Sequence, residues 1–93
     1  MRTLKKKRFY RHYKGGIYYV KEAGTHTETE DEMVIYQCIK GDTRTWIRPK
    51  EMFLSKMEDG VKNPLGHTYR FEEIKGLKSH FLKLIKLTIV NNN

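Results

Sequence analysis

Two β-prone runs joined by a glycine pair are the feature of this sequence that most restricts its fold. The runs RFYRHY, which begins at Arg8, and IYYVKEA alternate side-chain types as strands do, and Gly15 and Gly16 lie between them. Glycine tolerates the positive φ that tight hairpin turns require. The sequence therefore predicts an antiparallel hairpin here, on which the rest of the fold has to be built.

Two further runs extend this pattern. EMVIYQCI, which contains Tyr36, is dense in β-branched and aromatic residues, and RTWIR places Trp46 and Arg48 on one face of a strand. Pro49 has no N–H to donate to a sheet and suits the first turn of a helix. Short strands separated by turns predict a mainly β fold, a small SH3-like barrel of about five short strands over residues 8–71.

The pattern changes after Gly66. Apolar residues then follow helical spacing, with lysines on another side; these apolar residues are Ile74, Leu77, Phe81, Leu84 and Ile85. We expect one domain over residues 1–93, with a flexible basic start at 1–7, a C-terminal amphipathic helix at 72–90 and a tail at 91–93. Three arrangements are possible for this helix: it packs on the barrel, it associates with another copy in a homo-oligomer, or it lies on a membrane surface.

The formal net charge of +8 is concentrated at the two ends. Residues 1–14 hold seven Lys or Arg and no acid, and residues 74–93 hold four and none. Such a field attracts phosphates, nucleic acid or anionic lipid without choosing among them. The single cysteine, Cys38, the absence of a signal-peptide pattern and the lack of a run of roughly 20 apolar residues favour a cytoplasmic, non-integral protein.

No catalytic or metal-binding motif is present in the sequence. The candidate metal ligands show no close spacing; they are His12, His26, His67, His80 and Cys38. An acid–base pair of His26 with Glu28 is one interpretation, and a solvated loop is the other. We therefore expect a binding protein with no enzymatic activity, no metal and no cofactor.

Basic and aromatic residues are interleaved in the predicted strands and turns. Guanidinium groups beside flat rings can pair phosphates and sandwich a base; the alternative is that the rings form the barrel core beneath arginine stems. The expected ligand-binding set gives phosphate pairing to Arg48, Arg11 and Lys14, base stacking to Trp46 with Tyr36 or Tyr19, a hydrogen bond to His12 or His26, and further charge to Arg44.

Three blocks, YRHYKGGIYYV, HTETEDEMVIYQ and WIRPKEMF, resemble successive blocks of a family of short bacterial and phage proteins known as domain of unknown function 1653. The resemblance covers Phe9 to about Glu58 and implies a small β-rich domain. The matching positions are Tyr10, Arg11, His12, Lys14, Gly15, His26, Glu28, Tyr36, Trp46, Arg48, Pro49, Met52 and Phe53.

The sequence departs from the family pattern in two places. Glu30 and Asp31 stand where a glycine is more usual, and the chain continues into the lysine-rich helix. The family name carries no activity. By analogy with compact phage proteins, we expect a barrel that sequesters a phosphate-bearing ligand such as a nucleotide second messenger, as a phage anti-defence protein. The alternatives are a basic nucleic-acid-binding protein and an interaction module that blocks a host factor.

Overall fold

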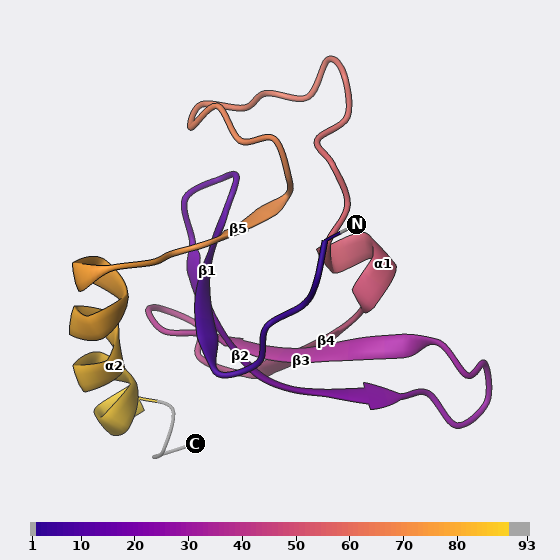
Figure 1. Cartoon of the computed structure of the whole chain (residues 1–93), viewed down its shortest axis with the longest axis horizontal. Helices are drawn as coiled ribbons and strands as arrows, with labels where there is room; N and C mark the ends of the chain where they lie inside the picture. The colour runs from indigo at the N-terminus through magenta and orange to yellow at the C-terminus, as the bar shows by residue number, and fades with distance from the viewer. Residues whose placement is uncertain (1, 90–93) are drawn as a thin grey trace.

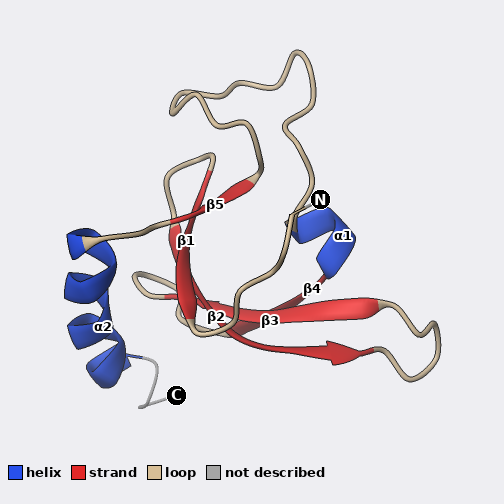
Figure 2. Cartoon of the chain, viewed as in Figure 1, coloured by secondary structure: helices blue, strands red, loops and turns tan. Residues whose placement is uncertain are grey.

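The hairpin predicted around Gly15 lies within a five-stranded antiparallel sheet (Figures 1 and 2). The computed structural model describes residues 2–89. The strands are β1 (Arg8–His12), β2 (Ile17–Thr25), β3 (Glu32–Cys38), β4 (Thr45–Pro49) and β5 (Phe71–Glu73), and the helices are α1 (Lys50–Phe53) and α2 (Leu77–Ile89). The strand order β4-β3-β2-β1-β5 means that the chain runs as a meander through four strands and then returns β5 to the side of β1.

The turn between β1 and β2 has the geometry that its glycines predict. Gly15 has a φ of 110°. The N–H of Gly15 donates to the carbonyl of His12, and the N–H of His12 donates to the carbonyl of Gly16, both at 2.8 Å. A residue with a β-carbon rarely adopts this φ, so the hairpin prediction is confirmed together with its physical reason.

The sheet curls but does not close. A bulge at Lys21, where the register shifts between Val20 and Glu22, bends β2. β4 and β5 are the two edges of the sheet and do not pair with each other. The mainly β class is therefore confirmed, whereas the expected barrel is not closed. α1 begins directly after Pro49, as predicted, and buries Phe53 completely.

Both faces of the sheet are covered. Because successive residues of a strand point to opposite faces, the adjacent Phe9 and Tyr10 of β1 enter different cores. The inner core contains Tyr10, Val20, Val34, Tyr36, Phe53 and Phe71. The outer core, on the side of α2, contains Phe9, Tyr19, Ile39, Ile74 and Leu82.

The basic start expected to be flexible is held on the open side of the sheet. The Arg2 guanidinium donates to the carbonyls of Leu54, after α1, and Phe71, in β5, at 2.8 and 2.7 Å. It therefore bridges the two sides of the gap between β4 and β5. Leu4 packs against the inner core. The sequence suggested mobility because like charges dominate, but backbone carbonyls and carboxylates of the folded chain accept these cations.

The C-terminal helix begins later than expected. Glu72 and Glu73 belong to β5, and Gly76, with a φ of 74°, separates that strand from α2. On α2, Leu82 is buried, while Phe81 and Leu84 are 64% and 58% exposed. Of the three possibilities left open for this helix, packing on the sheet therefore applies to Leu82 and not to Phe81 or Leu84. The side chains of Leu77 and Ile85, and residues 90–93, lie outside the described part of the chain.

No helix within residues 2–89 is both long and apolar enough to cross a membrane.

Candidate functional site

Aromatic rings gather around one arginine on the inner face of the sheet, in a group that we name the His12 cluster. It consists of His12, Tyr18, Tyr36, Arg48 and Phe71. His12 of β1 lies opposite Phe71 of β5, with ring centroids 4.8 Å apart and nearly perpendicular. The Tyr18 ring lies 5.7 Å from Phe71 and 5.4 Å from Tyr36, again edge to face. The rings therefore form a continuous aromatic surface.

Arg48 lies over this surface from β4. Its Nε donates to the Tyr36 hydroxyl at 3.2 Å, and its guanidinium carbon lies 5.8 Å from the centre of the Phe71 ring. Among the residues that the structure describes, Arg48 forms no ion pair. A guanidinium has five N–H donors. Within residues 2–89 its side chain makes one hydrogen bond, through Nε, so the two terminal NH₂ groups can bind a ligand.

His12 is held as a neutral imidazole. Its pKa is lowered from 6.5 to about 4, chiefly by burial, then by the positive charge of Arg48, and further by Lys14, Arg70 and His67. The N–H of Lys14 donates to Nδ1 of His12 at 3.1 Å. This bond requires a lone pair on Nδ1, so it also favours the neutral form.

The cations around His12 come from separate segments that hydrogen bonds hold together. The N–H of Tyr13 donates to the carbonyl of Arg70 at 2.9 Å, which joins the β1–β2 turn to the loop before β5. Asn63 fixes the backbone of His67 through two bonds, at 2.7 and 2.9 Å. The Arg70 guanidinium pairs with the exposed Glu58 at 3.3 Å. Three segments thus bring positive charge to one imidazole.

Four of the residues predicted from sequence lie together in or beside the cluster: His12, Lys14, Tyr36 and Arg48. Trp46 lies directly opposite Tyr36 in the β3–β4 ladder, and therefore on the same face, with 41% of its surface exposed. Arg44 lies 5.1 Å from the centre of the Trp46 ring. These two extend the predicted set along β4.

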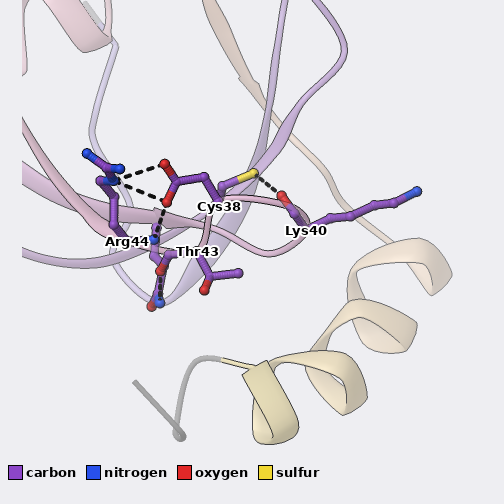
Figure 3. A network of polar contacts seen from close by, with 6 residues as sticks. Cys38, Lys40, Thr43 and Arg44 are labelled. Atoms are coloured by element: carbon purple, nitrogen blue, oxygen red, sulfur yellow. Dashed lines mark hydrogen bonds and ion pairs between the residues drawn. The ribbon is translucent and has the colours of Figure 1, made fainter.

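Arg44 is already engaged within the turn between β3 and β4 (Figure 3). Its Nε lies 2.9 Å from a carboxylate oxygen of Asp42. From the end of β3, the Gln37 side-chain amide donates to the Thr43 carbonyl of this turn, and the Cys38 thiol donates to the Lys40 carbonyl at 2.9 Å. Because Arg44 is paired with Asp42, it is less available than Arg48 to bind an anionic ligand.

Three predicted residues do not join the cluster. Tyr19 is 5% exposed in the outer core, where its ring lies 5.0 Å from Phe9. Arg11 pairs in register with Ile17 of the outer face and donates to the Gly15 carbonyl at 3.3 Å. His26 lies beyond the last pair of the β2–β3 ladder, where Nδ1 accepts two backbone N–H groups of its own loop. The alternation of β1 and β2 places Arg11 and Tyr19 on the outer face of the sheet, whereas His12 is on the inner face. This alternation is visible in the sequence and could have excluded the two residues from the site.

The sequence prediction also missed four residues of the cluster and its surroundings: Tyr18, Phe71, His67 and Arg70. Tyr18 shares the strand face of Val20, so alternation could have identified it. The other three come from a long loop and a three-residue strand without a periodic signal. Only the pairing of β5 with β1 brings them to His12.

The arrangement suits anion binding better than acid–base chemistry at neutral pH. His12 has no carboxylate beside it in the described structure, and the charges that act on its pKa are cationic. Burial also raises the pKa of the Tyr18 phenol, so it stays a neutral hydrogen-bonding group. Within residues 2–89, no three His, Cys, Asp or Glu side chains are grouped to hold a metal ion.

Comparison with known proteins identifies one family, and its model covers all five strands. The family model described as "Protein of unknown function (DUF1653)" matches residues 8–73. The match runs from the start of β1 to the end of β5 and leaves α2 outside it. No curated protein and no solved structure gives a significant match. Since the match covers most of the chain, including every member of the His12 cluster, this protein belongs to the DUF1653 family.

Proposed function

We propose that the protein binds a phosphate-bearing small ligand at the His12 cluster and does so without catalysing a reaction. The observation that carries this proposal is the half-buried Arg48 guanidinium, which is fixed by Tyr36, lies near the Phe71 ring and has no carboxylate partner in the described chain. A buried or half-buried cation without a counterion is costly unless a ligand supplies the charge. A phosphate meets this need because it accepts two parallel N–H bonds from a guanidinium.

The surroundings of Arg48 support an anion with more than one contact. Lys14 is in the β1–β2 turn, and Arg70, which also pairs with the exposed Glu58, is in the loop before β5; the charges of both act on His12. The imidazole of His12 adds a neutral hydrogen-bonding group between them. An isolated carboxylate ligand would use only part of this charge, whereas a phosphate offers several oxygens to donors that come from different directions.

The exposed ring of Trp46 favours a nucleotide within this class. It lies on the same strand face as Arg48, two residues away, so a base stacked on the ring could carry its phosphate to the guanidinium. Sequestration of a nucleotide second messenger, as a phage anti-defence protein would perform it, is the role that such binding without chemistry would suit.

Long nucleic acid is the less favoured ligand. Two lysines of the basic start form ion pairs within the chain: Lys6 lies 2.8 Å from Glu22 and Lys5 lies 3.8 Å from Glu73. Such pairs reduce the charge available for release of counterions from a duplex. The basic start is therefore a weaker electrostatic footprint than its sequence suggests.

The test is calorimetric titration of the full chain with inorganic phosphate and with linear and cyclic nucleotides. Arg48→Ala removes a charge-assisted contact of roughly 1.5 to 3 kcal/mol and should weaken binding at least about tenfold. Arg48→Lys keeps the charge and loses the planar, two-donor geometry of the guanidinium, so its affinity should lie between those of the wild type and Arg48→Ala. Lys6→Gln is the matched control, because it also removes one positive charge, and its affinity should stay within about twofold.

Binding that is equally weak in Lys6→Gln and Arg48→Ala would mean that net charge, and not this site, holds the ligand. If no phosphate or nucleotide binds, parallel gel-shift assays with single- and double-stranded DNA and RNA decide the alternative. Nucleic-acid binding that falls steeply with salt and is insensitive to Arg48→Ala would show that a charged surface, and not the His12 cluster, binds the ligand.

A further inference from the structure

The turn that follows β1 selects the tautomer of His12. The backbone N–H of Lys14 donates to Nδ1 of His12 at 3.1 Å. An imidazole nitrogen that accepts a hydrogen bond carries a lone pair, so the proton of the neutral ring lies on the other nitrogen, Nε2. The turn is itself fixed by the N–H of Gly15, which donates to the His12 carbonyl at 2.8 Å. His12 therefore presents Nε2 as an N–H donor.

Aromatic rings surround the imidazole on several sides. Its centroid lies 4.8 Å from that of Phe71, 4.3 Å from that of Tyr13 and 6.4 Å from that of Tyr18. These contacts and the bond at Nδ1 together fix the orientation of the ring. Within residues 2–89 no group of the chain accepts a hydrogen bond from Nε2, and His12 is only half-buried. The chain thus leaves this donor unused and open to a ligand.

The charged groups around His12 oppose a positive charge on its ring. After burial, which lowers the pKa most, the charges that lower it belong to Arg48 of β4, Lys14 of the turn, and Arg70 and His67 of the loop before β5. Tyr18 of β2 adds no charge at neutral pH, because burial raises the pKa of its phenol. His12 is therefore an uncharged donor among cations, and the group that suits it is an anionic acceptor.

We propose that neutral His12 donates its Nε2 proton to an unprotonated phosphate oxygen of the ligand that Arg48 binds. Both side chains lie near Phe71, with the guanidinium carbon 5.8 Å from the centre of its ring. The Tyr36 hydroxyl, which accepts from Nε of Arg48, keeps its own proton to donate. These donors match oxygens that carry no proton, as in a phosphodiester or a fully ionised monoester. This role of His12 rests on the proposed function, since Arg48 holds the same anion.

The alternative is that His12 binds the anion as an imidazolium. Both ring nitrogens would then carry protons, and the N–H of Lys14 would face a second N–H in place of its acceptor. A bound anion would compensate the added charge beside Arg48, but it would not replace the acceptor that the turn loses. The neutral donor keeps the turn intact and is therefore favoured.

The test begins with a long-range proton–nitrogen correlation spectrum of the histidine rings, recorded on the full chain at about pH 7.5 with and without inorganic phosphate. Without phosphate, His12 should show the neutral form with the proton on Nε2. Saturation with phosphate should shift the Nε2 resonance of His12 more than that of His26 and leave the ring neutral. His26 is the internal control, because its Nδ1 also accepts backbone N–H groups and it lies outside the cluster.

Calorimetric titration with phosphate measures the contribution of the donor. His12→Phe keeps an aromatic ring and removes the N–H, so it should weaken binding at least about tenfold. The matched control His26→Phe should stay within about twofold of the wild type. The amide of His12→Gln can accept from Lys14 and also donate to the ligand, so its affinity should lie between those of the wild type and His12→Phe.

The outcomes separate this role of His12 from the proposed function. Unchanged affinity in His12→Phe would overturn the role and leave the Arg48 site standing, as would a bound His12 that is charged or carries its proton on Nδ1. A wild type that does not bind phosphate would overturn the proposed function and the role with it. Should His12→Phe melt early in a circular-dichroism scan, the spectra of the wild type decide alone.

Discussion

The two faces of the sheet bury similar residues and depend on different parts of the chain. The inner face is closed by rings from four strands and α1, and the N-terminal segment lies over its open side. The outer face is closed by α2, which contributes one described buried side chain, Leu82. A core sealed by many elements can also hold a polar group such as Arg48 in place. A core sealed by one side chain leaves the rest of its helix available for a partner.

The largest loss of stability should follow removal of the ring at the centre of the inner face. Phe71 is 1% exposed and stacks on Phe53 with ring centroids 4.1 Å apart. It also touches the rings of His12, Tyr18 and Tyr36. Phe71→Ala should lower the free energy of unfolding by about 3 to 5 kcal/mol, measured by urea denaturation. The exposed Leu65→Ala is the control and should change it by less than about 0.5 kcal/mol.

The outer face should be less sensitive. Leu82→Ala removes the one described helix side chain in that core, and because solvent can enter beside α2, the loss should be about 2 to 3 kcal/mol. A loss of unfolding free energy equal to that of Phe71→Ala would mean that the two cores contribute equally to stability. The same variant should leave ligand affinity at the His12 cluster within about twofold, since α2 does not contribute to that site.

The sequence predicted that Trp46 and Arg48 share a face, and they do because they are two residues apart in β4. The same alternation places Val34 and Tyr36 in the inner core and Ile39 in the outer core. The hairpin followed from Gly15. These features are local, and the period of a strand or the φ of one glycine determines them.

Features that depend on contacts between distant segments could not be predicted from the sequence. The three-residue β5 was assigned to the helix, because Glu72 and Glu73 fit helical spacing and only pairing with β1 makes them a strand. The site was predicted in part for the same reason: His12, Lys14 and Arg48 are in elements with a clear pattern, whereas Arg70 arrives through the long loop. The inclusion of Arg11 shows a different error. Arg11 is next to His12 in the sequence, but adjacent residues of a strand point to opposite faces of the sheet.

Arg2 provides a smaller test of how the inner face is closed. Its guanidinium donates to two carbonyls on either side of the open edge and lies 3.9 Å from the centre of the Tyr69 ring. Arg2→Ala should therefore cost about 1 to 2 kcal/mol of unfolding free energy. Thr3→Ala, at an exposed neighbouring position, should cost almost nothing. Equal values for the two variants would mean that the start of the chain does not seal the sheet.

The protonation of His12 gives the inner face a pH dependence of its own. Its pKa is about 4 in the folded chain and about 6.5 when unfolded, so between these values the unfolded chain binds more protons. The contribution of His12 to stability is therefore complete above about pH 6.5 and is lost progressively as the pH falls toward 4. Urea denaturation at pH 7 and pH 5 should show a larger loss in the wild type than in His12→Gln, which can still accept the Lys14 N–H and does not titrate.

His12→Gln also removes ring contacts, so its stability is expected to be lower at both pH values, and only the difference between the two pH values bears on the titration. The remaining histidines and carboxylates are common to both proteins and cancel in that comparison. A parallel loss in the two proteins would show that His12 titrates normally and is open to water. The inner face would then be loose where Arg48 and Phe71 meet the imidazole, and the aromatic seal that distinguishes it from the outer face would not extend to the site.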